Sequence, residues 1–242
     1  MELEEYEKMY HFEEKYWWWV GKRKIVKCML NKLKLDSSRI LDIGCGTGAN
    51  LEYLGDYGSV VGLDYAREAL DFCRLRKHRN LVRGDAERLP FKEGAFDLIT
   101  ALDLLEHIDD SKAAEGFSKA LKPGGHLILT VPAFRFLWSK HDEALHHKRR
   151  YSKSQLKQVL ESTGFVVEKI GYWNFFLFLP VASVRLIKKN ILKSKKVKTD
   201  VEELPSIINW FLAFILTVES HLIPCINLPF GVSIVCVARV DK

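Results

Sequence analysis

The stretch ILDIGCGTGAN, residues 40–50, constrains the fold of this chain more than any other part of it. Apolar residues, with Asp42 among them, run directly into Gly44, Gly46 and Gly48. Because glycine loses more conformational freedom than any other residue when its backbone is fixed, three glycines in five positions indicate a need for bare backbone. A glycine-rich turn between a strand and a helix meets that need, since it lets a ligand approach backbone N–H groups at the helix N-terminus.

The spacing of these glycines indicates the kind of ligand. The dinucleotide-binding pattern is G-x-G-x-x-G, which suits a pyrophosphate, whereas the spacing here is G-x-G-x-G. Asp42 stands in the strand before the turn, where its carboxylate would repel a pyrophosphate but hold an ammonium group, directly or through water. The pattern therefore favours a zwitterionic nucleoside over a dinucleotide.

Short apolar runs that end in Gly or Asp alternate with helical stretches along the chain. The runs are RILDIG, VVGLD, LVRGD, FDLITA and HLILTVP, followed by GFVVEKI and, near the C-terminus, VSIVCVARV. This alternation is typical of βα units around a parallel sheet. We predict an α/β protein with a doubly wound sheet in residues 36–171 plus 231–242. A helical segment, residues 1–35, precedes this core, and a helical insertion, residues 172–230, interrupts it before the last strand.

Several motifs accompany the glycine turn. LDIGCGTG resembles the first motif of class I S-adenosylmethionine-dependent methyltransferases, and VVGLD, GDAERLPF, FDLITALDLLEHI and LKPGGHLILTVP follow in that family's order over residues 40–132. One glycine turn is a weak signal, but the ordered set is specific. The resemblance implies a seven-stranded, Rossmann-like methyltransferase fold with strand order 3-2-1-4-5-7-6 and an antiparallel last strand. It also implies S-adenosyl-L-methionine as cofactor.

The same resemblance implies roles for residues at the ends of strands. Asp64 would accept both ribose hydroxyls, and Asp85 would receive the adenine amino group beside the backbone N–H of Ala86. Asp103 would line the methyl-bearing side of the cofactor. Capping of a turn or helix is the alternative interpretation of Asp85 and Asp103. The full predicted cofactor site comprises Asp42, Gly44, Cys45, Gly46, Gly48, Asp64, Tyr65, Asp85, Ala86 and Asp103, together with Trp18 and Arg23.

Those last two residues belong to an aromatic and basic stretch, YWWWVGKRKIV, that precedes the core. It resembles a segment found before the core of many small-molecule methyltransferases. That resemblance implies that Trp18 closes over the cofactor and that Arg23 binds its carboxylate. An amphipathic helix whose tryptophans fill the core explains the same pattern equally well.

The loop expected after the fifth strand, PAFRFLWSKHDEALHHKRRYS, carries candidate acceptor-site chemistry. Ligands of open α/β sheets lie beyond the carboxyl ends of the strands, where this loop begins. Asp142 and His146 suit metal chelation if they are helical, but no further ligand is arranged around them, so we predict no metal site. A general base, an anion clamp and a solvated loop remain as interpretations. The candidate bases are His107, His146 and His147, and the candidate substrate-binding residues are His141, Arg149, Arg150 and Tyr151.

The insertion joins two apolar stretches, the second of them IINWFLAFILTV, through a lysine run, KKNILKSKKVK. Each apolar stretch is shorter than the ~20 residues that a membrane-spanning helix needs. The pattern is typical of a buried helical cap, of helices on an anionic membrane surface, of a substrate lid or of a dimer contact. HDEALHHKRRYS and the ending PFGVSIV resemble methyltransferases of glycan or lipid assembly. That resemblance implies a small, lipid-linked or glycan-type acceptor, methylated at oxygen or carbon.

Composition narrows the function further. The net charge of +6 fits phosphates, nucleic acid or an anionic membrane without choosing among them. Five cysteines without a CxxC pair, and an acidic start without an apolar core, favour a cytoplasmic protein, with peripheral contact at the inner membrane face as an option. A nucleic-acid substrate is disfavoured, because ALDLLEHI stands where base-amino methyltransferases carry an NPPY-like loop. The alternative functions are an RNA methyltransferase and a catalytically silent scaffold that binds a membrane or a partner protein.

Overall fold

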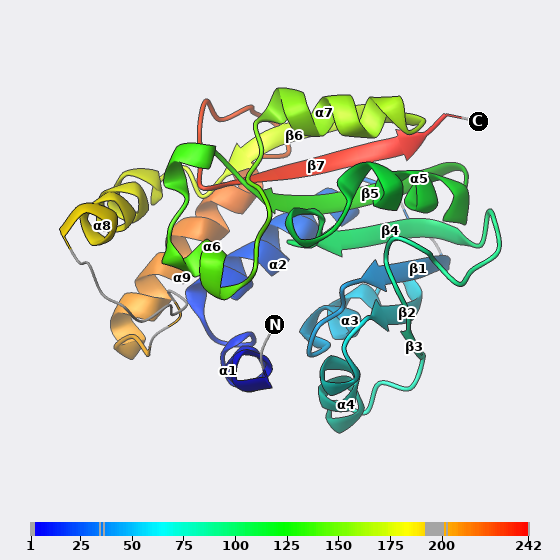
Figure 1. Ribbon diagram of the computed structural model, residues 1–242, viewed down its shortest axis with the longest axis horizontal. Coiled ribbons are helices and arrows are strands. Elements are labelled where there is room, and N and C mark those ends of the chain that lie inside the picture. The colour runs from blue at the N-terminus through cyan, green and yellow to red at the C-terminus, as the bar shows by residue number, and fades with distance from the viewer. Residues whose placement is uncertain (1–2, 34, 36, 192–200, 202, 242) are drawn as a thin grey trace.

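The computed structural model describes residues 3–33, 35, 37–191, 201 and 203–241 (Figure 1). Its strands are β1 Ser38–Ile43, β2 Gly58–Asp64, β3 Leu81–Arg83, β4 Phe96–Leu102, β5 Leu121–Pro132, β6 Phe165–Trp173 and β7 Ser233–Val240. They form one seven-stranded sheet in the order β3-β2-β1-β4-β5-β7-β6. β1 pairs in parallel with β2 and β4, whereas β7 is antiparallel to both β5 and β6. The predicted fold and strand order are confirmed.

Helices lie on both faces of this sheet (Figure 1). The α-helices are α1 Leu3–Phe12, α2 Trp17–Leu30, α3 Ala49–Leu54, α4 Arg67–Leu75, α5 Asp110–Ala120, α6 Lys140–Ala144, α7 Lys153–Ser162, α8 Phe178–Ile191 and α9 Ser206–Leu222. Two short 3-10 helices, η1 Leu105–His107 and η2 Arg135–Leu137, follow β4 and β5. α5 and α7 cover one face, and α2 and α9 cover the other (Figure 1).

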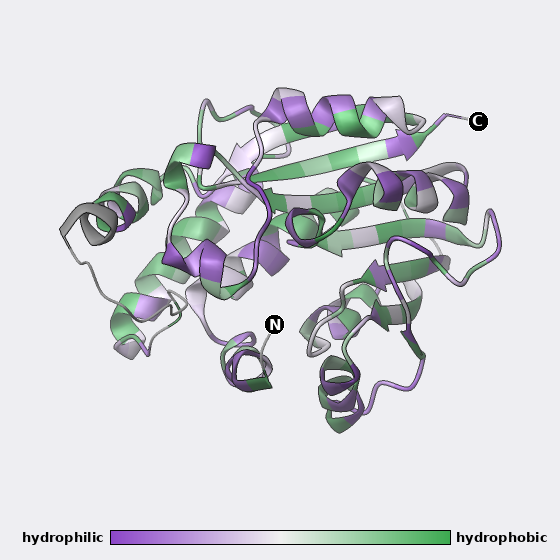
Figure 2. Ribbon diagram, viewed as in Figure 1, coloured by the Kyte–Doolittle hydropathy of each residue, from purple (hydrophilic) through white to green (hydrophobic). Residues whose placement is uncertain are grey.

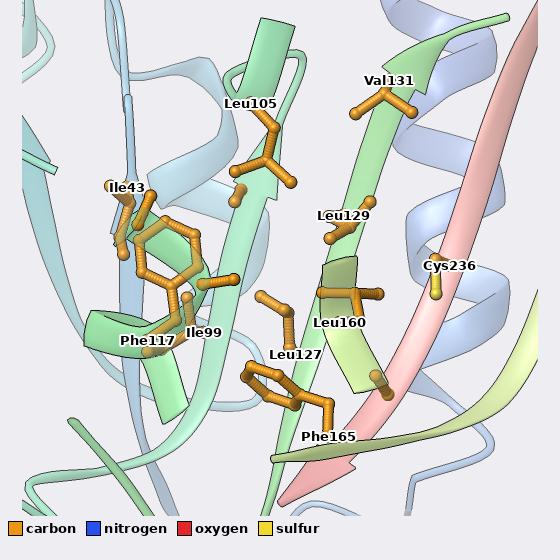
Figure 3. Packing of buried hydrophobic residues seen from close by; sticks show 14 of the residues in the cluster. Ile43, Ile99, Leu105, Phe117, Leu127, Leu129, Val131, Leu160, Phe165 and Cys236 are labelled. Atoms are coloured by element: carbon orange, nitrogen blue, oxygen red, sulfur yellow. The ribbon is translucent and has the colours of Figure 1, made fainter. Parts of the chain in front are cut away.

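The strand β1 contributes side chains to two hydrophobic cores, one on each face of the sheet. Successive side chains of a strand point to opposite faces. Ile43 therefore packs in the cluster that contains Phe117 of α5 and Leu160 of α7 (Figure 3). Ile40 instead joins the cluster that contains Val26 of α2 and residues of α9. Burial on both faces explains why the central strands are continuous apolar runs rather than alternating ones.

The insertion contains α8 and α9, and β6 continues through Trp173 before the insertion begins. α9 carries hydrophobic residues along much of its length (Figure 2) and lies against α2. Contact between these two helices is close, because a Cβ atom at Gly21 would lie only 2.3 Å from Cδ1 of Leu216. Residues 192–198 of the predicted lysine run lie outside the described residues. Within the described part of the chain, each helix is too short or too polar to cross a membrane.

Candidate functional site

A cavity of about 1280 Å³ lies at the carboxyl ends of β1, β2, β4 and β5, where open α/β sheets bind ligands. The glycine turn and the ends of β2 and β3 form one end of its wall. Residues of α8 and α9 form the other end, and the loops after β4 and β5 lie between. Ligand pockets commonly measure ~300–1,000 Å³. This cavity therefore has room for a nucleoside and a second ligand.

The glycine turn has a backbone conformation that favours glycine at all three positions. Gly44, Gly46 and Gly48 have φ angles of 71°, 55° and 92°, in the left-handed region that favours glycine. Space is also short, because a Cβ atom at Gly44 would lie 3.0 Å from Cδ1 of Leu104. Gly44 and Gly46 line the cavity. Bare backbone thus faces the space where a ligand would lie.

Asp64 ends β2 beside this turn and also lines the cavity. One carboxylate oxygen accepts the backbone N–H of Gly46, and the other accepts that of Ala66, both at 2.9 Å. Burial raises the pKa of Asp64 above its ordinary value. Each carboxylate oxygen can accept a further hydrogen bond, so the side chain is both fixed in place and able to receive hydroxyl groups.

The predicted adenine contacts, Asp85 and Ala86, lie on the same wall, and so does Tyr65, a further predicted cofactor residue. Asp85 also accepts the backbone N–H of Glu87 at 2.9 Å, which is the turn-capping role considered as its alternative. Capping and ligand binding are compatible, because a carboxylate has several acceptor positions.

Three predicted cofactor residues lie beneath the turn rather than on the cavity wall. The carboxylate of Asp42 is 1% exposed and accepts the Thr100 hydroxyl at 2.6 Å. Burial raises the pKa of Asp42 to about 7. Cys45 turns its thiol inward to 4.0 Å from that of Cys73, and Gly48 packs against the same cysteine. These residues support the turn instead of meeting the cavity.

Residues of the N-terminal helices α1 and α2 line the cavity, among them one that the sequence predicted and one basic residue that the sequence analysis missed. Trp18 lines the cavity and packs on Trp173, with ring centroids 4.8 Å apart. The predicted Arg23 does not reach the cavity, because its guanidinium donates to the backbone carbonyls of Glu13 and Glu14. Lys22 lines the cavity in its place. Its position four residues after Trp18, on one helix face, was the available signal.

Lys22 meets the end of β4 at Asp103. Its Nζ lies 2.9 Å from Oδ2 of Asp103, and Oδ1 accepts the Thr130 hydroxyl at 2.8 Å. Although burial acts to raise it, the pKa of Asp103 is held below its ordinary value by Lys22. Asp103 therefore stays ionised at the middle of the cavity wall. Asp103 has a φ of 54°, and Glu106 and His107 of the following η1 also line the cavity.

The loop after β5 is organised around the buried Asp142. Arg150 donates to both of its carboxylate oxygens, at 2.7 and 3.0 Å, and Nδ1 of His147 lies 2.9 Å from Oδ1. Despite burial, these partners hold the pKa of Asp142 well below its ordinary range. α6 ends at Ala144, before His146, so Asp142 pairs with His147 instead. The His147 ring lies 4.7 Å from that of His107, whose pKa burial lowers to about 4.

The arginines of the predicted anion clamp are engaged within the protein. Arg150 forms the ion pair with Asp142 described above. Arg149 lies 2.7 Å from Asp110, which also accepts the hydroxyl of Tyr151 at 2.8 Å. Arg149 and Tyr151 are absent from the cavity wall. The candidate substrate residue His141 and the candidate base His146 do line the cavity. Arg149 and Arg150 therefore do not form a free pair for an anion, and His107, His141, His146 and His147, which all line the cavity, are the better-placed groups.

Comparisons with known proteins agree with this geometry. Residues 41–129 match the family described as "Methyltransferase domain". The chain is similar to a demethylmenaquinone methyltransferase of Staphylococcus haemolyticus, with 29% identity in an alignment that covers 62% of this chain and 77% of that protein. It is also similar to a ubiquinone biosynthesis O-methyltransferase of Alkalilimnicola ehrlichii, with 35% identity over 40% of this chain and 42% of that protein.

The overall fold has counterparts among solved structures. A methyltransferase from Haloferax volcanii, solved in complex with the Trm112 methyltransferase activator, matches with a TM-score of 0.63 at 17% identity. That match covers 99% of this chain and 94% of the other. At such low identity the likeness shows the fold alone. The curated relatives are matched over 28% to 77% of their own length, most often about half.

Proposed function

We propose that this chain, whose core is a class I S-adenosylmethionine-dependent methyltransferase domain, methylates an oxygen or carbon atom of a small, lipid-soluble acceptor. The observation that carries this proposal is the cavity with two unlike ends. One end offers bare backbone and carboxylates, and the other offers the apolar side chains of Leu177, Val181 and Leu212. Relatives whose names specify menaquinone and ubiquinone support an acceptor of the quinone type.

The polar end suits the cofactor. The turn at Gly44 and Gly46 would receive the amino-acid part of S-adenosyl-L-methionine, Asp64 its ribose and Asp85 its adenine. A carboxylate beside a glycine turn at a helix N-terminus is the usual arrangement for a nucleoside in open α/β sheets. The sulfonium methyl group of this cofactor is already activated, so aligning it with the acceptor supplies most of the rate.

The middle of the cavity suits the reacting groups. A hydroxyl acceptor must lose a proton when it attacks, and the histidines at 107, 146 and 147 line this region. The Asp142 carboxylate fixes the orientation of His147, which is how a carboxylate prepares an imidazole for acid–base work. Methyl transfer to carbon needs the same alignment but depends less on a proton acceptor.

The apolar end of the cavity adjoins an exposed apolar surface on α8 and α9. On α9, Ile207, Phe211, Phe214 and Val218 recur at helical spacing and are each more than two fifths exposed, and Trp210 stacks on Phe214. In the sequence, a lysine run, residues 188–198, follows the apolar stretch of α8. An apolar helix face beside lysines is typical of attachment to an anionic membrane surface. We therefore infer that the acceptor enters from a lipid surface between α8 and α9.

Transfer of labelled methyl groups tests the proposal. The purified chain is incubated with S-adenosyl-L-methionine carrying a radioactive methyl group, together with either the lipid extract or the aqueous extract of cells. Label is expected in the organic phase of the lipid reaction. Label confined to aqueous products or to nucleic acid would contradict the acceptor class. Binding of S-adenosyl-L-homocysteine, measured by calorimetry on the same preparation, separates a wrong acceptor from a failed cofactor site.

A further inference from the structure

Three side chains with metal-binding atoms gather on the cavity wall between the two ends. They are Glu106 and His107, from η1, and His147, from the loop after α6, and one ligand atom of each lies within 4.8 Å of the others. We propose that this cluster binds a divalent transition-metal ion of the zinc type. The sequence analysis considered only Asp142 and His146 as a chelating pair and predicted no metal site; α6 ends before His146, and the cluster consists of other residues.

Glu106 gives the first argument for an ion. Its side chain is completely buried, and within the described part of the chain neither carboxylate oxygen has a hydrogen-bond partner. Burying a carboxyl group without partners costs free energy that a native fold rarely leaves uncompensated. The residue also borders the cavity, so an ion could reach it. A cation between Glu106 and the two imidazoles would satisfy its oxygens.

His147 gives the second argument. Its Nδ1 lies 2.9 Å from Asp142, which leaves Nε2 as the atom available to a metal. Metal-binding histidines almost always make such a contact from the other ring nitrogen to a carboxylate, which fixes the ring. Asp142 is itself held by Arg150 at both oxygens. The imidazole is therefore oriented before any ion arrives.

The two ligand-bearing segments are also fastened to each other. The backbone N–H of Lys148 donates to the carbonyl oxygen of Glu106 at 2.7 Å, and the Tyr151 hydroxyl donates to the carbonyl of Leu105 at 3.2 Å. Donor atoms around one tetrahedral zinc lie about 3.3 Å apart, given metal–ligand bonds of ~2.0–2.1 Å. The ligand atoms lie within 4.8 Å of one another, so side-chain rotations that bring them up to about 1.5 Å closer would complete the site.

The ligand set indicates the kind of ion and leaves a position open. Two imidazoles and one carboxylate are a known ligand set of catalytic zinc, in which the fourth position holds water or substrate. Imidazole ligands favour zinc, copper, iron and nickel over magnesium and calcium. If the proposed function holds, the fourth position would take an acceptor oxygen and make its proton easier to lose. His146, outside the ligand set, would then remain to accept that proton.

Cobalt(II) titration tests the site directly. The protein is freed of metal by dialysis against a chelator, and Co²⁺ is added while the visible absorption bands of the ion are recorded. Zn²⁺ then competes in calorimetry. We expect one equivalent to bind saturably, and Glu106→Gln and His147→Ala each to weaken binding at least tenfold. The matched control is His146→Asn, in the same loop, where the φ of 56° suits asparagine and binding should be unchanged.

Several outcomes would overturn the inference: no saturable uptake by the wild-type chain, equal affinity in the two ligand variants, or the same loss in the His146→Asn control. Circular dichroism shows whether each variant is folded. Anomalous diffraction from wild-type crystals soaked in Co²⁺ gives an independent answer that needs no variant, and a peak away from Glu106 would also reject the site. If S-adenosyl-L-homocysteine binds while no metal does, the inference fails and the proposed function stands.

Discussion

The two ends of the cavity are built in different ways. At the polar end, which we call the cofactor end, the decisive features are backbone conformations and hydrogen bonds from backbone N–H groups, such as those that the carboxylate of Asp64 accepts from Gly46 and Ala66. In the middle of the cavity and at its apolar end, which we together call the acceptor end, side chains from distant segments meet, as in the Lys22–Asp103 pair and the contact of α2 with α9. A site made from backbone presents one fixed shape to one ligand. A site made from long-range side-chain contacts can bind different ligands in proteins that share the same backbone-built cofactor site.

The largest expected effect is the loss of stability when the buried carboxylate of Asp142, at the acceptor end, is removed. Asp142 and Arg150 are both buried, and Asp142→Ala would leave the guanidinium uncompensated. We expect the free energy of unfolding to fall by about 3–5 kcal/mol. Urea denaturation measures this, with Glu115→Ala, which removes an exposed ion pair with Lys119, as the control that should change little. An Asp142 variant as stable as wild type would show that the acceptor loop does not depend on this pair.

The glycine turn should depend on backbone shape. Gly48 has a φ of 92°, and a Cβ there would lie 3.3 Å from Cα of Cys73, an atom that cannot move aside easily. Gly48→Ala is therefore expected to lower the free energy of unfolding by about 2–3 kcal/mol. At Gly46 the close atom is the flexible end of Met9, at 2.9 Å, and Gly46→Ala should cost about 1 kcal/mol. Equal losses in thermal or urea unfolding would contradict this reading of the turn.

Removal of Asp64 tests the cofactor end through binding. Asp64→Ala should weaken the binding of S-adenosyl-L-homocysteine by roughly 1.5–3 kcal/mol, the scale of hydrogen bonds to a charged group, which is about 10- to 150-fold in Kd. Calorimetry measures it, and Asp71→Ala, on the exposed side of α4, is the control. Unchanged affinity would remove Asp64 from the site.

The cofactor end could be predicted because its signals are local in the sequence. The strand pattern places Asp64 and Asp85 after strands, and the glycine spacing marks the turn between β1 and α3. The pattern did not distinguish residues that line the cavity from residues that are buried beneath the turn. Asp42 lies inside β1 and Cys45 lies in the turn, and both are buried instead of lining the cavity. Alternation along a strand does not reveal this, because Asp42 stands an even number of positions from Gly44 and Gly46, which do line the cavity.

The acceptor end was predicted only in outline. The choice of Arg23 instead of Lys22 followed the resemblance, whereas helix phase places Lys22 on the face of Trp18. The pairing of Asp142 with His147 depends on α6 ending at Ala144 and on a left-handed residue at His146. Neither feature has a periodic signal. The meeting of Glu106 with His147 depends on a contact between segments about forty residues apart, which spacing along the chain does not encode.

The pH dependence of the free energy of unfolding tests the buried Asp42 beneath the cofactor end. Burial raises the pKa of Asp42 to about 7. Between about pH 4 and 7 the folded chain therefore keeps a proton on Asp42 that the unfolded chain has released. The free energy of unfolding should fall as pH rises through this range, by up to about 1.4 kcal/mol per pH unit from this residue. Asp42→Asn keeps a partner for Thr100 and should remove that part of the slope. Equal slopes for variant and wild type in urea denaturation between pH 4.5 and 7 would contradict it.

The smallest expected effect is a difference in membrane binding between the outer surfaces of the two ends, α9 at the acceptor end and α4 at the cofactor end. Trp210 on α9 and Leu75 on α4 are similarly exposed, at 62% and 66%, but only Trp210 lies on the apolar surface beside the acceptor end. Trp210→Ser should weaken binding to anionic vesicles about fivefold, or ~1 kcal/mol, while Leu75→Ser leaves it unchanged. Flotation with vesicles of anionic phospholipid measures both. Equal losses would mean that exposed apolar residues anywhere on the chain promote binding, and the lipid-facing role of α9 would fail. A change in sedimentation of Trp210→Ser without any change in flotation would instead assign the surface to contact between copies of the chain.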